Sequence, residues 1–160
     1  MTRDDVLAAT REAAVSADAV ADHLERLRHR LEPAFPLDPV VLAGWDDDPR
    51  ERLHALLRMY EQLFDLTSRK LFRGYLFLAG ETIAGMSAQN QFRRIEALGP
   101  LSDADRWIEL GTIRNMLVHD YPSNPVAQAT RANLAWNALP DLIAQTRSVV
   151  ATLRAEGHLA

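Results

Sequence analysis

The chain has 160 residues, 48% of them hydrophobic and 25% charged, with a net charge of −4 at pH 7 and no cysteine. This length predicts a single domain over residues 1–160 with a sizeable core. The negative charge argues against a protein that coats nucleic acid without specificity. The lack of cysteine excludes disulfides, a thiol nucleophile and a cysteine-ligated zinc site.

The sequence carries no visible targeting segment. Its first residues include Arg3, Asp4 and Asp5 rather than the apolar stretch of a secretory signal. No apolar run approaches the roughly 18 residues of a transmembrane helix. The five histidines are dispersed, without the spacing of a metal site. We therefore expect a cytoplasmic protein with no membrane contact and no metal or other cofactor.

The first predicted helix covers residues 3–31, and the prolines at positions 33 and 36 end it. Its apolar residues follow the three-and-four spacing of an amphipathic helix, as in Val20, Leu24, Leu27 and Leu31. Residues 33–48, rich in proline and acidic residues, predict a loop. A loop of this length either covers one end of the helical core or binds a partner, and the sequence leaves both open.

Asp48 and Pro49 predict the start of a second helix, with Asp as its cap and Pro at its first position. Helical spacing of apolar residues then continues to about Ala79. On this helix Glu61 and Asp65 are four residues apart and share a face. They are surface charges, a pair of catalytic carboxylates, or partners for a cation in the core.

A short helix over residues 87–97 follows, with Ser87 as its predicted cap. Helical spacing places Phe92 and Ile95 inward, and Arg93 and Arg94 outward. Despite the negative net charge, a local basic groove stays open as an interpretation. It would draw on Arg69, Lys70, Arg73, Arg93 and Arg94.

Two long helices complete the chain. Ser102, with a carboxylate three residues later, predicts the start of one, and Pro122 forbids its continuation. Asn124 and Pro125 predict the cap and first residue of the last helix, which extends to about Glu156. No stretch has the alternation of a strand. We therefore predict an all-α fold, an up-and-down bundle of four long helices plus a short helix.

Residues 114–121, Arg-Asn-Met-Leu-Val-His-Asp-Tyr, bring an arginine, an amide, a histidine and a tyrosine together near the end of an apolar helix. At about 100° per residue, Arg114 lies inside the core-facing arc of this helix. That arc holds Trp107, Leu110, Ile113, Leu117 and Val118. A guanidinium there must pair with a carboxylate, a carbonyl or an anion, because an unpaired buried charge is costly. The candidate carboxylates are Glu61, Asp65 and Glu81.

Gly111, Asn115 and His119 lie outside that arc, on a second and narrower surface of the same helix. A glycine there lets another backbone approach closely. We therefore expect the helix to contact its own core on one side and a second subunit on the other. A two-fold dimer of this kind would bring two copies of Arg114 and His119 into one cleft.

Histidine and arginine suit the cleavage of RNA without a metal ion. The 2′-hydroxyl must lose a proton and the leaving 5′-oxygen must gain one, and histidine as a residue type does both near neutral pH. Arginine stays charged and matches the charge that builds on the phosphorane oxygens. The structural alternative is that His119 bonds a carbonyl at the helix end while Arg114 pairs with an acid in the bundle.

The pattern Arg114-Asn115, three residues, His119, one residue, Tyr121 resembles the signature of the HEPN superfamily, and in particular of HepT-like toxins. The motif covers eight residues, and the chain length and helical pattern agree with that family over most of the chain. The resemblance implies a HEPN-like bundle and a homodimeric, metal-independent endoribonuclease, with tRNA among its candidate RNA substrates. Arg114, Asn115 and His119 would be its catalytic residues, with Asn115 orienting the histidine or binding the phosphate.

The resemblance also implies a partner. HepT-like toxins pair with a minimal nucleotidyltransferase (MNT) antitoxin, which transfers AMP to the matching tyrosine, here Tyr121. The added bulk and negative charge would keep an RNA phosphate away. Packing of the Tyr121 ring against the bundle end is the structural alternative. For the whole chain, the alternatives are a non-catalytic HEPN module that binds a nucleotide or presents a substrate to a nucleotidyltransferase, and a purely structural helical adaptor.

Overall fold

The computed structural model describes residues 1–119 and 122–159, and all regular elements in these residues are helical. They are α1 (Arg3–Leu31), the 3₁₀ turn η1 (Glu32–Ala34), α2 (Pro39–Ala43), α3 (Asp47–Leu66), the π turn η2 (Thr67–Leu71), α4 (Phe72–Leu78), α5 (Ala88–Leu98), α6 (Ala104–Val118) and α7 (Pro125–Ala155). The prediction of an all-α fold is confirmed for this part of the chain. No helix in it is both long enough and apolar enough to cross a membrane.

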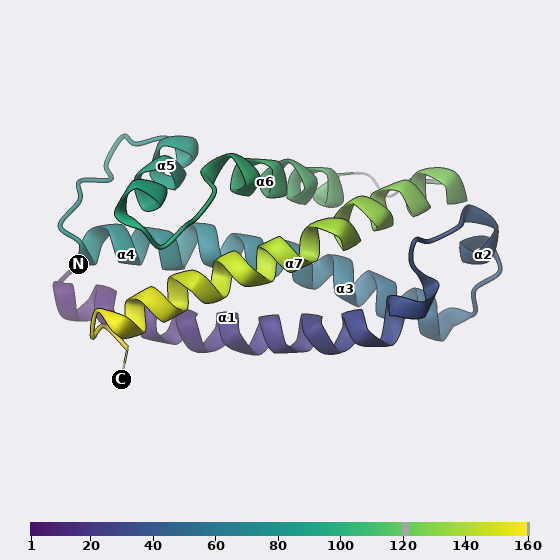
Figure 1. Cartoon of the computed structure of the whole chain (residues 1–160), viewed down its shortest axis with the longest axis horizontal. Helices are drawn as coiled ribbons and strands as arrows, with labels where there is room; N and C mark the ends of the chain where they lie inside the picture. Colours follow the sequence, from purple (N-terminus) through teal and green to yellow (C-terminus); the bar gives the residue numbers. More distant parts are fainter. Residues whose placement is uncertain (120–121, 160) are drawn as a thin grey trace.

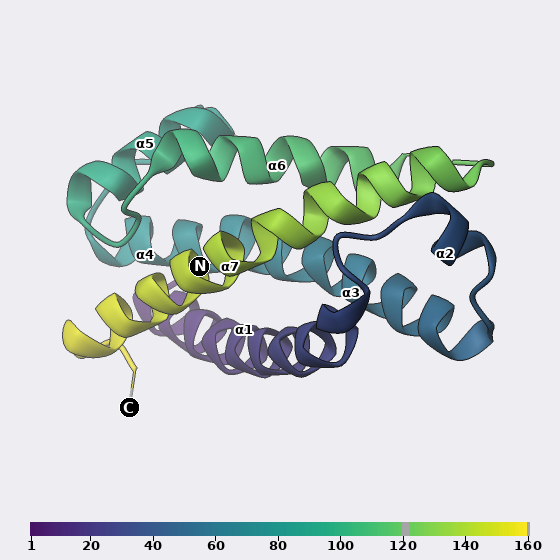
Figure 2. The ribbon, with the colours of Figure 1, turned by 45° about the vertical axis from the view of Figure 1, so that its right-hand side comes forward.

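The long helices lie roughly along one axis (Figure 1). The elements α3, η2 and α4 form one continuous rod, which packs against α1 on one side and against α6 on the other. Helix α7 crosses this rod and contacts both α1 and α6. Figure 2 shows α5 and α6 as an outer layer on the side of the rod away from α1. The helix that carries residues 114–118 is therefore at the periphery of the molecule.

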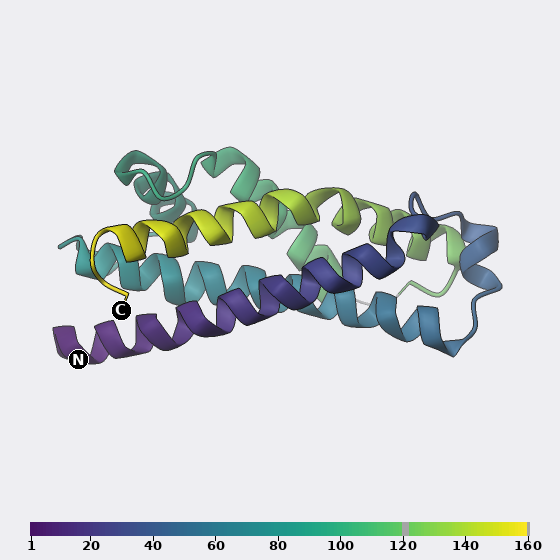
Figure 3. The same ribbon diagram turned by 60° about the horizontal axis from the view of Figure 1, so that its bottom comes forward.

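Helix α1 spans the residues predicted for it. Thr2 and Asp5 form a reciprocal capping box at its start, and its buried stripe includes Ala13, Ala14, Ala17 and Ala21. Small side chains allow neighbouring helices to approach closely, and α1 contacts α3, α4 and α7 along the bundle (Figure 3). The start of α1 and the end of α7 lie at the same end, where Arg11 Nε donates to the His158 carbonyl at 2.8 Å.

The segment predicted as a loop contains the short helix α2, whose cap Asp38 accepts a hydrogen bond from the Val40 amide at 2.7 Å. Leu37 and Leu42 are buried against Ala129 and Ala132 of α7. The backbone of Leu37 also exchanges two hydrogen bonds with the side chain of Asn133, at 2.7 and 3.0 Å. The segment therefore covers one end of α7, one of the two roles left open.

The second helix begins at Asp47, with Asp46 as its cap, so the prediction of Asp48 as cap and Pro49 as first residue is wrong by two positions. Pro49 is tolerated as the third helical residue because the first amides of a helix have no intrahelical partner in any case. The π turn in the middle of the rod was not predicted. Its Thr67 hydroxyl is buried and lies 2.9 Å from the Thr146 hydroxyl of α7.

Helix α6 is capped by Asp103, whose Oδ1 accepts from the Arg106 amide at 2.9 Å, and not by Ser102 as predicted. Ser102 instead binds the side chain of Gln145 on α7 through its amide and its hydroxyl. The predicted caps Ser87 and Asn124 are confirmed, since they accept from the amides three residues later.

Candidate functional site

The packing of α6 on the rod depends on Trp107, which is completely buried. Its ring stacks on Phe64 with centroids 5.0 Å apart and also contacts Phe72 and Phe92. The indole Nε1 donates to the Ser68 hydroxyl of the π turn at 3.0 Å. This aromatic cluster fixes the first half of α6, since aromatic burial contributes strongly to packing and the indole donor is satisfied.

A second contact fixes the middle of α6. The buried Tyr60 hydroxyl of α3 donates to the Leu110 carbonyl at 2.9 Å. Burial raises the pKa of the Tyr60 hydroxyl, which therefore remains a donor. In an α-helix this carbonyl also accepts the amide four residues later, that of Arg114. The backbone of Arg114 is thereby tied to α3.

The side chain of Arg114 is held by Asp65 of α3. Arg114 Nη2 donates to Asp65 Oδ2 at 2.7 Å, and Nη1 donates to the Asn115 Oδ1 at 3.3 Å. The side chains of Arg114 and Asp65 are only 19% and 30% exposed. The hydrogen bond that Arg114 donates to Asp65 raises the pKa of Arg114, so the guanidinium is charged. The expected need for a buried partner is confirmed.

Of the three candidate carboxylates, Asp65 is the one that binds Arg114. Glu61 pairs with Arg58 at 3.4 Å, and Glu81 pairs with Arg94 at 2.6 Å. The Nε of Arg114 is buried and makes no hydrogen bond to a described residue.

Gly111 has a role that differs from the expected one. A Cβ at this position would lie 2.9 Å from Cζ of Phe64, so the glycine makes room for a ring of its own chain rather than for a second backbone. Phe64 cannot easily move away because it stacks on Trp107. The expectation that Gly111 marks a subunit contact is therefore not supported at this residue.

Arg114 and Asn115 line a cavity of about 420 Å³ between the rod, α5 and α6. The rod contributes Phe64, Asp65, Ser68, Arg69 and Arg73. Helix α5 contributes Ala88, Gln89, Gln91 and Phe92, and α6 adds Ile108, Gly111 and Thr112. Sequence reasoning missed Ser68, Gln89 and Gln91, because no motif marks them and only the packing of α5 on the rod brings them to the cavity.

His119 follows the last residue of α6 and is exposed. It lines a separate, open depression with Met116, Pro122, Ala127 and Arg131, and its carbonyl accepts from Arg131 Nη2 at 3.5 Å. Within one chain, Arg114 and His119 therefore face different hollows. Asn115 shares the cavity with Arg114 and not the depression of His119.

The end of α6 is less covered than its apolar pattern predicted. Trp107 and Leu110 are fully buried, but Ile113 and Leu117 are only partly buried, and Val118 is 44% exposed. Met116 is partly buried as well. The second half of this arc therefore presents apolar surface next to Asn115 and His119.

Tyr121, the predicted modification site, lies outside the described residues, as does Asp120. Among the described residues, no group of three or more His, Asp or Glu side chains is placed to hold a metal ion.

Comparison with protein-family models, with curated proteins and with solved structures finds no match to this chain.

Proposed function

We propose that this chain is the toxin of a HEPN/MNT toxin–antitoxin pair, a metal-independent endoribonuclease on a HEPN-like up-and-down bundle. The observation that carries the proposal is the fixed position of Arg114. Asp65 and Asn115 hold its charged guanidinium at the wall of a cavity, on the helix that ends at the exposed His119. A held cation on a helix and an exposed imidazole at the end of that helix are groups that phosphodiester cleavage needs.

The chemistry follows from these groups. The RNA 2′-oxygen bonds to phosphorus while its proton passes to one histidine. The bond from phosphorus to the 5′-oxygen breaks while that oxygen takes a proton from a second histidine. The products are a 2′,3′-cyclic phosphate and a 5′-hydroxyl. Arg114 stabilises the charge on the phosphorane oxygens through those N–H groups of its guanidinium that Asp65 and Asn115 leave unused.

One chain supplies one His119, so the acid and the base come from two protomers of a homodimer. The partly exposed apolar residues Ile113, Met116, Leu117 and Val118 support this, because they provide surface for a two-fold contact beside His119. The separation of the Arg114 cavity from the His119 depression within one chain supports it as well. In the dimer, Arg114 of one protomer would work with His119 of the other.

Neutralisation is proposed to occur at Tyr121. A partner nucleotidyltransferase would transfer AMP from ATP to the tyrosine hydroxyl, releasing pyrophosphate. Tyr121 is two residues after His119 in the sequence. The added phosphate would repel the RNA phosphate and occupy space near the histidine.

A second candidate is a non-catalytic HEPN module that binds a nucleotide or presents a substrate to a nucleotidyltransferase. The pairing of Arg114 with Asp65 favours it, because the charge of the arginine already has a partner. Binding needs only the cavity, whereas cleavage also needs His119. Substitution of His119 therefore separates the two candidates.

The test uses purified protein, total RNA and a chelator of divalent metals. Arg114→Ala is expected to lower the cleavage rate by about 10²- to 10³-fold, and His119→Ala by about 10²- to 10⁴-fold. The matched control is His29→Ala, an exposed histidine on α1, which should cleave as the wild type does. Cleavage that persists in both site variants, with unchanged helical content, would rule out the ribonuclease proposal.

The dimeric site has its own test. Wild type and His119→Ala are unfolded together, refolded at varying ratios and assayed at constant total protein. If two histidines from two protomers are required, activity falls with the square of the wild-type fraction. A linear fall would show that each chain acts alone.

A further inference from the structure

Three basic residues on the rod have no partner in the described part of the chain. Arg69, Lys70 and Arg73 are exposed and make no hydrogen bond or ion pair to any described residue. The neighbouring arginines of α5 differ, since Arg93 pairs with Asp105 and Arg94 with Glu81. Of the five basic residues that the sequence offered for a basic groove, the three on the rod therefore remain candidates to bind an anion.

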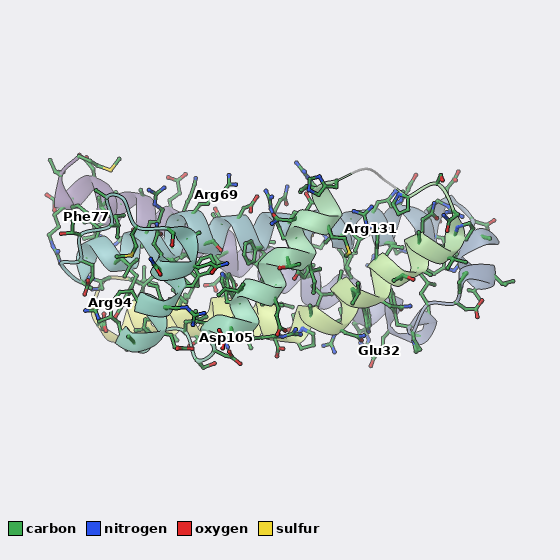
Figure 4. The ribbon with its side chains drawn as sticks, turned by 90° about the horizontal axis from the view of Figure 1, so that it is seen from above. Glu32, Arg69, Phe77, Arg94, Asp105 and Arg131 are labelled. Atoms are coloured by element: carbon green, nitrogen blue, oxygen red, sulfur yellow. The ribbon has the colours of Figure 1, made fainter. Side chains whose placement is uncertain are left out.

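The π turn explains why these residues face outward. Thr67 is held inward by Thr146, and Ser68 is held by the Trp107 indole. The next two residues of the turn, Arg69 and Lys70, are exposed on its outer side, and Leu71 at its end is buried. Figure 4 shows Arg69 at one long edge of the molecule, with Asp105 toward the opposite edge. Single π turns within helices are rare and occur often at functional sites.

Arg69 and Arg73 line the same cavity as Arg114. Three guanidinium groups and the single carboxylate of Asp65 line it, which leaves an excess of two positive charges. The charge of Asp65 is directed at Arg114, so Arg69 and Arg73 are available to an anion. Two guanidinium groups at one opening suit a phosphate, because each presents several donors to its oxygens.

The rest of the lining suits a nucleobase. Phe64 and Phe92, which are 8% and 7% exposed, give the cavity an apolar aromatic wall, and the exposed side-chain amides of Gln89 and Asn115 supply donors and acceptors. The bases of single-stranded RNA are recognised by contact with aromatic side chains and by hydrogen bonds to the base edges. The volume of about 420 Å³ is within the range of small-ligand sites.

We propose that this cavity binds one nucleotide of a single-stranded RNA, with its base in the cavity and a phosphate on Arg69 and Arg73. The choice of RNA rests on the proposed function, since Arg114 would then place this nucleotide beside the cleaved bond. The binding chemistry does not rest on it, because a free mononucleotide carries the same base and phosphate. The experiment must therefore distinguish a nucleotide within an RNA strand from a free mononucleotide.

The first arm measures binding without cleavage. The wild type is titrated with a fluorescent single-stranded oligoribonucleotide whose 2′-hydroxyls are methylated, which removes the attacking group. The double variant R69Q/R73Q is expected to bind at least about tenfold more weakly. The slope of log affinity against log salt concentration should fall by about 0.7 for each phosphate that the variant no longer neutralises. The charge-matched control is R26Q/R30Q, which removes two exposed arginines of α1 and should bind as the wild type does.

The second arm tests the cavity without altering a charge. Ala88 is exposed and lines the cavity, so Ala88→Leu adds bulk at its wall and introduces a good helix former. We expect weaker binding with an unchanged salt slope. The control is Asn90→Leu, an exposed residue of the same helix that does not line the cavity.

Equal affinities and salt slopes in the wild type, R69Q/R73Q and Ala88→Leu would overturn the proposal. A different outcome is that the protein binds AMP, CMP, GMP or UMP with the same dependence on Arg69 and Arg73 and fails to bind the oligonucleotide. This result would show that the ligand of the cavity is a free mononucleotide and not RNA. A protein that binds the oligonucleotide as expected but cleaves no RNA would disprove the ribonuclease function and leave this site standing. If the R69Q/R73Q variant cleaves RNA as well as the wild type does, the proposed nucleotide site is disproved and the ribonuclease function is not affected.

Discussion

The guanidinium of Arg114 and the carboxylate of Asp65 lie 2.7 Å apart, although 49 residues separate them in the chain. The pair joins α6 to α3 at the wall of the cavity. Its members are mostly buried, so each side chain would be left without its ionic partner if the other were removed. This pair is the point at which the fold fixes the geometry of the proposed site.

A double-mutant cycle on this pair is expected to show strong coupling. Arg114→Gln, Asp65→Asn and the double variant should give a coupling energy of about 1–2 kcal/mol in urea unfolding, because hydrogen bonds between charged, partly buried groups exceed exposed ones. The control cycle uses Arg93 and Asp105, whose side chains are 55% and 79% exposed. Its coupling should stay below about 0.5 kcal/mol. Equal coupling in the two cycles would contradict the role given to Asp65.

Gly111→Ala is expected to destabilise the protein by about 1–3 kcal/mol, because the new methyl group meets Phe64 at 2.9 Å and that ring stacks on Trp107. Thermal or urea unfolding measures the change. Gly44→Ala is the control, since its Cβ would meet nothing closer than 3.7 Å. If Phe64 is the cause, Phe64→Leu should partly rescue Gly111→Ala. A Gly111→Ala protein as stable as the wild type would show that the ring has room to move.

The buried Thr67 and Thr146 hydroxyls bond to each other across the interface between the rod and α7. Thr67→Val leaves the Thr146 hydroxyl without this partner, and we expect a loss of about 1–3 kcal/mol in the free energy of unfolding. Thr146→Val should cost a similar amount. The double variant should be less destabilised than the sum, because it buries no unpaired hydroxyl. Additive losses would indicate that each hydroxyl has another partner.

We expect the ionisation of the Tyr75 hydroxyl to lower the stability of the fold at high pH. Burial, with the neighbouring Glu156 carboxylate, raises the pKa of its hydroxyl from an ordinary value of 10.0 to about 12. The folded state therefore holds the proton more tightly, and this stabilisation is complete below pH 10 and is lost as the pH rises through about 12. Urea unfolding at about pH 9 and about pH 11.5 should show a smaller loss of stability in Tyr75→Phe than in the wild type. Equal losses in the two proteins would assign the loss of stability at high pH to other groups.

The sequence predicted the ends of α1 and the existence of each long helix, because prolines and periodic apolar residues mark them. It misplaced two caps for a simple reason. Each pair of polar residues, Asp46 with Asp48 and Ser102 with Asp103, lies within two positions and contains only types that cap helices, so the sequence does not choose between them. The π turn left no signal, since apolar residues keep their spacing on both sides of it.

The site was partly predictable in the same sense. The apolar arc around Arg114 predicts a carboxylate, a carbonyl or an anion as its partner, and Asp65 is one of three candidate carboxylates. The sequence does not show which of Asp65, Glu61 and Glu81 pairs with Arg114, because the partner depends on how α6 is placed along the rod. The same placement brings Arg69 and Arg73 to Arg114 and leaves Arg93 and Arg94 in ion pairs elsewhere.

The most direct test of the ribonuclease proposal is expression in a bacterial host without any nucleotidyltransferase. The wild type and His119→Ala are induced to equal levels, and growth and new RNA 5′-hydroxyl ends are measured together. We predict that the wild type arrests growth and produces new ends, and that His119→Ala does neither. If both proteins accumulate in folded form and neither arrests growth nor produces new ends, the chain is not a ribonuclease toxin.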